Sequence, residues 1–306
     1  MKKPIVVGLG EILWDVFDGQ KKLGGAPANF AYHASQQGAD GIAVSAIGKD
    51  VLGAEIVSAL AGKNFRAEFL RTAQPTGTVQ ISLDAHGVAS YDFAPDCAWD
   101  NLQMTPQLAE LARETAAVCF GSLAQRGERS RAAIHDFLKK VPANALKIFD
   151  VNLRQNFFSE QTIRDSLALA NALKINEDEL GVLEKFFCEN ALAQSDFATR
   201  RERFFEKIFE TFPSVNLQIL TCGGAGSYVA TRAGDFSFVA ADSETKIVDT
   251  VGAGDSFTAT FAMSLLRGES IFAAHRHATD VANFVCTQHG AMPEIPQTLL
   301  AAETLS

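Results

Sequence analysis

Short apolar runs rich in β-branched residues alternate along this chain with longer segments that have the apolar period of helices. Helix-like segments at 26–38 and 52–64 each follow one of these runs. The runs that read as buried strands or strand ends lie at 4–10, 42–48, 116–123, 145–152 and 215–223. Alternation of this kind is typical of a parallel sheet covered by helices on both faces. The pattern therefore predicts a three-layer α/β sandwich with a mainly parallel central sheet.

Two stretches, 12–24 and 76–99, do not fit this rhythm. The first has strand-like residues around a turn at 18–19, and the second alternates like an antiparallel hairpin with turn residues at 84–87. We expect the two stretches to pair into a small β-sheet on a single domain that spans 1–306. Such a sheet can act as a lid over a site or be a plain surface element. Its edges would also suit pairing with a second copy in a homodimer.

Composition narrows the classes of function. The chain has 306 residues, 47% of them hydrophobic, and a net charge of -9, which argues against nucleic acid and anionic lipid as partners. No run is long and apolar enough to span a bilayer, and 4–10 reads as a strand rather than a signal peptide. Five scattered cysteines without a CxxC pair are typical of reduced thiols. We expect a cytoplasmic protein without a membrane partner.

The stretch "DTVGAGDSF" (249–257) places three small residues, Gly252, Ala253 and Gly254, directly before Asp255 and an apolar helix. Free backbone N–H groups at such a helix start make an anion site, which suits a phosphoryl group in transfer. A carboxylate beside that site would be a general base that takes a hydroxyl proton. The alternative is that Asp255 is only the N-cap of the helix.

A second small-residue turn, "LGGAPANFA" (23–31), also opens a helix. Gly25 would let the backbone approach a ligand closely, and Asn29 can both donate to and accept from sugar hydroxyls. Asp15 is either a polyol ligand or a surface acid. Asp150, Asn152 and Arg154 alternate at the end of a predicted strand, and Arg154 would be a clamp for phosphate or sugar.

Polar residues also follow two later strands. In "LTCGGAGSYV" (220–229), Thr221, Gly223 and Gly226 would cradle part of a nucleotide, or form an ordinary tight hairpin. In "KINEDEL" (174–180), Asn176 and Glu179 could face the same way at a helix start. Glu179 would then hold Mg²⁺ through water, or the pair would simply cap the helix.

Known glycine-rich nucleotide motifs do not fit the sequence. Gly8 and Gly10 lack the third glycine of the dinucleotide fingerprint, where Leu13 stands instead. The P-loop pattern is also missing from the sequence. A phosphoryl-transfer enzyme with this sequence therefore needs another anion cradle, for which 252–255 is the candidate.

Residues 24–48 ("GGAPANFAYHASQQG…IG") and 249–261 ("DTVGAGDSFTATF") resemble the two signatures of the ribokinase/PfkB carbohydrate kinases. The resemblance extends from Gly8 to Gly290, with "NEDE" and "TCGGAG" in the order that the family has its metal/phosphate and nucleotide motifs. Within the family, "GEILWD", "GGAPANFA", "AWD" and "DVNLR" are most similar to fructokinases.

The resemblance implies a ribokinase-like fold and ATP-dependent phosphorylation of a ketohexose, most closely D-fructose at its terminal hydroxyl. It implies Asp255 as base and 252–254 as anion hole. The implied sugar contacts are Asp15, Gly25, Asn29 and Arg154. The implied nucleotide, phosphate and Mg²⁺ contacts are Asn176, Glu179, Thr221, Gly223, Gly226 and Asn283. The alternatives are a related kinase for ribose, 2-keto-3-deoxygluconate or a nucleoside, a non-catalytic sensor of sugar or nucleotide, and, more distantly, an NAD-dependent oxidoreductase.

Many relatives in this family also bind a monovalent cation such as K⁺ beside the anion hole. The matching positions here are Asp249, Val251, Cys286, His289 and Gly290. Because backbone carbonyls would hold the ion, the side chains at these positions say little about it. Thr260 stands where the second signature usually has Gly or Ala. This departure concerns the packing of the helix rather than the chemistry.

Overall fold

The computed structural model describes residues 2–63, 65–83, 89–188, 195–242 and 244–300. A large sheet contains the strands β1 (Ile5–Leu9), β4 (Asp40–Gly48), β5 (Arg66–Thr72), β8 (Thr115–Phe120), β9 (Leu146–Asp150), β10 (Ala172–Asn176), β11 (Leu217–Thr221), β12 (Ser227–Thr231) and β13 (Phe236–Val239). Their order is β13-β12-β11-β10-β9-β8-β1-β4-β5. The strands from β11 to β5 pair in parallel, and β12 and β13 are antiparallel.

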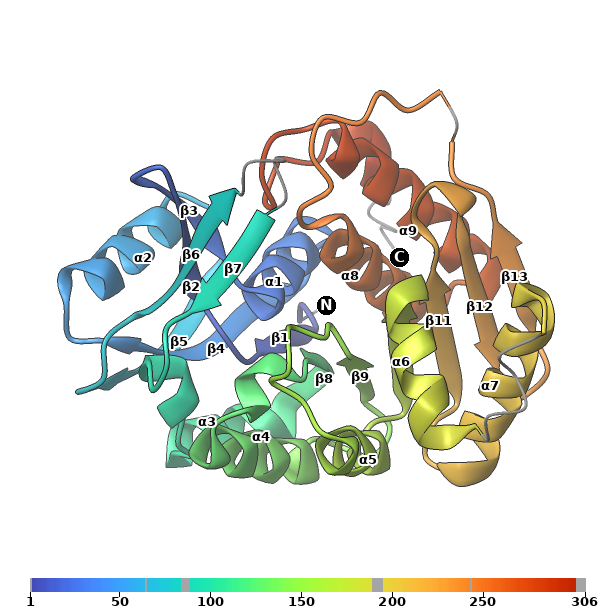
Figure 1. Ribbon diagram of the computed structural model, residues 1–306, viewed down its shortest axis with the longest axis horizontal. Helices are drawn as coiled ribbons and strands as arrows, with labels where there is room; N and C mark the ends of the chain where they lie inside the picture. Colours follow the sequence, from blue (N-terminus) through green and yellow to red (C-terminus); the bar gives the residue numbers. More distant parts are fainter. Residues whose placement is uncertain (1, 64, 84–88, 189–194, 243, 301–306) are drawn as a thin grey trace.

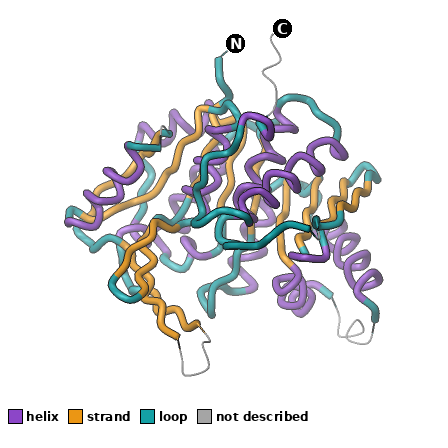
Figure 2. Tube along the Cα trace, turned by 90° about the horizontal axis from the view of Figure 1, so that it is seen from above, coloured by secondary structure: helices purple, strands orange, loops and turns teal. Residues whose placement is uncertain are grey.

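Helices cover both faces of this sheet (Figures 1 and 2). One layer contains α1 (Ala26–Gln36), α2 (Val51–Ala61), α8 (Ala253–Leu266) and α9 (Ile271–Cys286). The other contains α3 (Pro106–Glu114), α4 (Glu128–Lys140), α5 (Glu160–Leu169), α6 (Glu177–Phe187) and α7 (Phe197–Thr211). The predicted three-layer α/β fold is confirmed. Within the described ranges, no helix is both long enough and apolar enough to cross a bilayer.

Alternating side chains on the strands fill both interfaces. On β10, Leu173 and Ile175 pack with the α3–α7 layer, whereas Ala172 packs with the layer of α1, α8 and α9. Successive strand residues point to opposite faces, so Lys174 is directed toward the α8 side. A charged residue in a buried strand therefore lies beneath the helix that carries Asp255.

A second sheet contains β2 (Leu13–Phe17), β3 (Gln20–Gly24), β6 (Gly77–Leu83) and β7 (Ala89–Phe93), in the order β3-β2-β6-β7. The predicted pairing of the two irregular stretches is observed, because β2 and β6 lie side by side in parallel. Asp18 and Gly19 both have positive φ, 48° and 72°, as the tight turn of a two-residue hairpin requires. The turn predicted at 84–87 lies outside the described residues.

Gly8 allows α1 to pack directly on β1. A Cβ atom at Gly8 would lie 1.8 Å from the carbonyl oxygen of Pro27, in the first turn of α1. Gly8, the first glycine in "VVGLG", therefore permits close packing of a helix on a strand. This contact fixes the start of α1, which carries Asn29, above the end of β1.

The "AWD" segment (98–100) has a structural role in this fold. Asp100 forms a buried ion pair with Arg126 at 2.8 Å, and the Arg126 guanidinium lies 4.1 Å from the ring centre of Trp99. A Cβ atom at Gly77, the first residue of β6, would lie 2.2 Å from the indole nitrogen of Trp99. These contacts anchor the small sheet to the body of the protein.

Candidate active site

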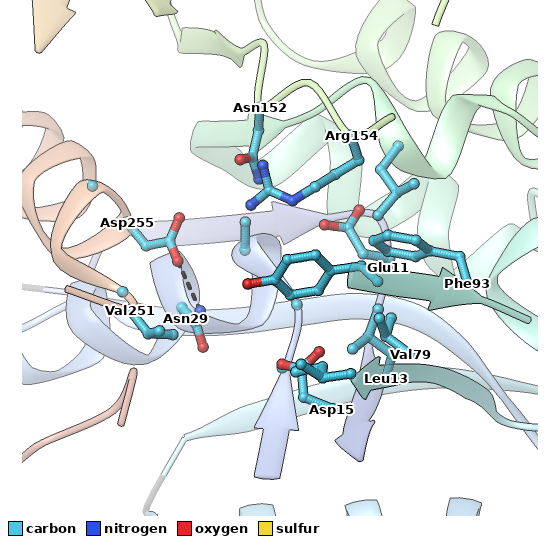
Figure 3. A pocket seen from close by; sticks show the side chains of 18 of the residues that line it. Glu11, Leu13, Asp15, Asn29, Val79, Phe93, Asn152, Arg154, Val251 and Asp255 are labelled. Carbon is cyan, nitrogen blue, oxygen red and sulfur yellow. Dashed lines mark hydrogen bonds between the residues drawn. The ribbon is translucent and has the colours of Figure 1, made fainter. Parts of the chain in front are cut away.

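A cavity of about 530 Å³ lies between the ends of the large-sheet strands, the small sheet and the start of α8 (Figure 3). The structure brings residues from distant parts of the chain to its wall. The predicted site residues on this wall are Asp15, Gly25, Asn29, Arg154, Val251, Gly252, Gly254 and Asp255. The predicted sugar contacts and the predicted base therefore share one cavity. Ala253 belongs to the same turn.

Helix α8 begins with an open main-chain turn. Gly252 is the N-cap residue with φ of 81°, a left-handed conformation that favours glycine, and no side chain caps the helix in the described structure. A Cβ atom at Gly254 would lie 3.2 Å from Nζ of Lys174. Backbone N–H groups at a helix start attract anions because they are unpaired and lie at the positive end of the helix dipole. In this turn the N–H group of Ala253 donates to the carbonyl oxygen of Thr250 at 3.3 Å, a long bond that a phosphoryl group would replace.

Asp255 is the third residue of α8, so the alternative in which it serves as the N-cap is wrong. Asn29 Nδ2 donates a hydrogen bond to Asp255 Oδ2 at 2.7 Å, which fixes the carboxyl at the cavity wall. Burial and the neighbouring Asp150 raise the pKa of Asp255 to about 6, although Asn29, Lys174 and Arg154 oppose the shift. A carboxylate with this pKa can accept a proton near neutral pH.

Asp150 and Lys174 form a buried ion pair beneath this site. They are directly opposite each other on the paired strands β9 and β10, and Lys174 Nζ lies 3.1 Å from Asp150 Oδ1. The predicted alternation of residues 150, 152 and 154 on one strand face is wrong. Strand β9 ends at Asp150, and Asn152 has a positive φ of 45° that turns the chain. Asn152 and Arg154 reach the cavity through this turn.

The predicted nucleotide contacts lie outside the residues that line the cavity. Asn176 and Thr221 are register partners at the ends of β10 and β11. Gly223 and Gly226 form the turn after β11 with φ of 49° and 104°. A Cβ atom at Gly223 would meet nothing within 4 Å, whereas one at Gly226 would lie 2.3 Å from the carbonyl oxygen of Val239, so the turn is open at Gly223 only. Asn283 lies on α9.

Asn176 and Glu179 form a capping box at the start of α6. Glu179 is buried, and its two oxygens accept hydrogen bonds from the backbone N–H groups of Leu153 at 2.8 Å and Asn176 at 2.9 Å. The capped helix start is confirmed, and the Mg²⁺ contact through water stays a prediction. In the part of the chain that the structure describes, no three His, Cys, Asp or Glu side chains gather to hold a metal ion.

The predicted cation positions come together beside α8. Asp249 accepts hydrogen bonds from the backbone N–H groups of Val251 at 3.0 Å and Gly290 at 3.1 Å. The carbonyl oxygen of Cys286 accepts from the N–H groups of Val248 and Asp249. His289 is exposed. Binding of a cation here stays a prediction.

The sequence interpretation missed several cavity residues, above all Glu11 and Lys174. Each had a signal in the sequence. Glu11 follows the buried strand β1 after one residue, Gly10, so it lies at the strand end where α/β proteins bind ligands. Lys174 is the one charged residue in the buried run "ALKIN", and a buried charge indicates a specific partner. The apolar lining from the small sheet, Val79, Ile81, Tyr91 and Phe93, was also missed.

Comparisons with known proteins agree with this geometry. Residues 5–298 match the family model described as pfkB family carbohydrate kinase. The chain is 31% identical over 265 residues to fructokinase from Klebsiella pneumoniae, which covers 82% of this chain and 81% of the relative. Fructokinase with bound ATP from Xylella fastidiosa has a similar fold, with a TM-score of 0.82 at 20% identity over 97% of this chain and 96% of that one. Ribokinase from Arabidopsis thaliana, solved with ribose and ATP, has a TM-score of 0.75 at 21% identity over 97% and 96%. The chain therefore belongs to the pfkB family of carbohydrate kinases.

Proposed function

We propose that this protein is an ATP-dependent fructokinase, which transfers the γ-phosphoryl group of ATP to the terminal hydroxyl of D-fructose. The observation that carries the proposal is the placement of Asp255 on the cavity wall, directly after the open turn of α8. The similarity to the Klebsiella pneumoniae fructokinase supports a ketohexose as the substrate.

In the proposed reaction, Asp15, Gly25, Asn29 and Arg154 bind the sugar with its hydroxyl facing Asp255. Asp255 takes the hydroxyl proton as the sugar oxygen forms a bond to the γ-phosphorus. The bond between that phosphorus and the ADP oxygen breaks, and the negative charge leaves with ADP. The N–H groups of 252–254 face the oxygens of the moving phosphoryl group and stabilise their charge.

The nucleotide would lie along the ends of β10 and β11, against Asn176, Thr221, Gly223, Gly226 and Asn283. Mg²⁺ binds proteins through few side chains and keeps much of its water, so the lack of a carboxylate cage in the described residues fits an ion held mainly by ATP. Glu179 would contact it through water. Such an ion lowers the repulsion between the phosphates. K⁺ would bind beside 249–251 and 286–290.

The small sheet would serve as a lid on the single domain. It covers the cavity with the apolar side chains of Val79, Ile81 and Phe93, beside the polar wall that carries Asp255. Apolar cover excludes water, which otherwise competes with the sugar as phosphoryl acceptor.

Activity should depend on pH through Asp255. The base must be ionised, and its pKa is raised to about 6, mainly by burial. We therefore expect kcat/KM for the sugar to fall at least tenfold per pH unit below this pH. Initial rates from pH 5 to 8 at fixed ionic strength measure this decrease at acidic pH. A profile that stays flat down to pH 5 would contradict the role of Asp255.

The substrate is tested by ADP release from MgATP with D-fructose, ribose, 2-keto-3-deoxygluconate and adenosine, each with and without K⁺. We expect the highest kcat/KM with D-fructose and a higher rate with K⁺. Preference for another substrate would correct the proposed specificity, and the proposed kinase activity would stand. ADP release with none of the four would count against the proposed reaction, and nicotinamide absorbance would then test the oxidoreductase alternative.

A further inference from the structure

Glu11 lies at the junction of the two sheets, between β1 and β2, and lines the cavity. Its side chain is 3% exposed, and its Oε2 atom has no hydrogen-bond partner in the described structure. Oδ1 of Asn29 is another buried oxygen of the same cavity without a partner there. A buried acceptor without a donor destabilises the protein that contains it. A ligand with several hydroxyl donors would remove this cost at both atoms.

The charges of the cavity also favour a neutral ligand. Burial raises the pKa of Glu11 to about 7 and that of Asp255 to about 6, and it raises the pKa of Asp15 as well. The charge of the Arg154 guanidinium opposes all three shifts, so one cation acts on three carboxyl groups at once. Lys174 is already paired with Asp150. An anionic substrate would therefore meet more negative than available positive charge.

Figure 3 shows how these groups are arranged. Asp255 and Asn29 lie on one side of the cavity, Glu11 lies on the other beside Phe93, and Arg154 extends between them. A sugar whose reacting hydroxyl faces Asp255 would direct its remaining hydroxyls toward Glu11. Asp255, not Glu11, follows the open turn of α8, so Glu11 serves binding rather than proton transfer.

We infer that Glu11 determines substrate specificity: with Asn29 Oδ1 it accepts hydroxyl groups of a neutral polyol, and with Asp15 it excludes sugar acids. This inference rests on the proposed function, because it places the reacting end of the sugar at Asp255. Glu11 thus selects the class of substrate, while the start of α8 provides the chemistry.

The test compares Glu11→Gln and Glu11→Ala with the wild-type protein at pH 8. The probe is D-fructose, or the neutral sugar that the ADP-release panel selects. We expect the KM for that sugar to rise at least tenfold in both variants, with the KM for ATP within twofold and kcat within threefold of wild type. Glu110→Gln, an exposed position on α3, is the matched control and should change none of these values. Calorimetric titration of the sugar should show the same loss of affinity without turnover.

Deoxy analogues of the sugar identify the contact itself. The analogue that lacks the hydroxyl bound by Glu11 should bind wild type at least tenfold more weakly than the parent sugar does. In Glu11→Ala, the analogue and the parent sugar should bind with the same affinity. The preference for the neutral sugar over 2-keto-3-deoxygluconate should fall at least tenfold in Glu11→Gln.

Folding is a separate readout, because at pH 8 the change removes a buried negative charge, whose cost appears as the raised pKa of Glu11. The melting temperature of Glu11→Gln without sugar should equal or exceed that of wild type. Unchanged sugar KM in both variants, or a loss confined to kcat, would overturn the inference. Wild-type ADP release tests the proposed function by itself, so the two failures are distinguishable.

Discussion

Replacement of Asp255 by Asn is expected to lower kcat by a factor on the order of 10² or more. The amide cannot take up the hydroxyl proton, so the reaction loses its base. The fold should persist, since the amide oxygen can still accept the hydrogen bond that Asn29 now donates to Asp255 at 2.7 Å. Affinities for sugar and ATP should change little, because the open turn at 252–254 and the sugar contacts stay in place. Steady-state ADP release and calorimetric titration of each substrate measure these values.

The stability of Asp255→Asn provides an internal check. The pKa of Asp255 is about 6 in the folded protein against an ordinary 3.8, so ionisation costs folded-state stability as pH rises through this interval. At pH 8 the variant should therefore melt at the same temperature as wild type or higher. Asp136→Asn, at an exposed position on α4, is the matched control and should retain full turnover. Near-normal turnover in Asp255→Asn would remove Asp255 from its proposed role.

Replacement of Gly8 by Ala should be the most damaging change at a residue outside the cavity. The added Cβ would lie 1.8 Å from the Pro27 carbonyl oxygen, and backbone atoms cannot move aside as a flexible side chain can. Either α1 shifts away from β1 or the strand is displaced. We expect a loss of ~3 kcal/mol in the free energy of unfolding, measured by urea denaturation. Because α1 also carries Asn29, kcat/KM for the sugar should fall with it.

Gly62→Ala is the matched control for this prediction. Gly62 follows α2 with an ordinary φ of -77°, and a Cβ atom there would meet nothing within 4 Å. The free energy of unfolding should change by no more than about 0.5 kcal/mol. If Gly8→Ala were as mild as this control, the close contact between β1 and α1 would not limit stability.

Local signals in the sequence predicted the fold class and the elements around the site. Apolar periodicity fixes which face of a helix or strand is buried, so it predicted the layers. The residues at 18–19 predicted the tight turn of the β2–β3 hairpin, because its backbone requires positive φ. The small residues before Asp255 likewise predicted a helix start without a side-chain cap. Gly252 is needed there because a Cβ atom would lie 2.5 Å from the carbonyl oxygen of Ala291.

The tertiary structure decided which polar residues share the cavity. Strand order and register place Lys174 opposite Asp150, and no local pattern contains that pairing. The sequence left the capping and metal interpretations of Glu179 open. In the fold, Glu179 accepts the capping hydrogen bond from Asn176 and a second one from the distant backbone of Leu153. Glu11 looked like an ordinary acid after a strand, and only the packing of β1, α1 and the small sheet buries it. Whether a side chain is buried, and whether its hydrogen-bonding atoms have partners, depends on residues that are distant in the sequence and become neighbours only in the fold. Local sequence patterns therefore do not specify these properties.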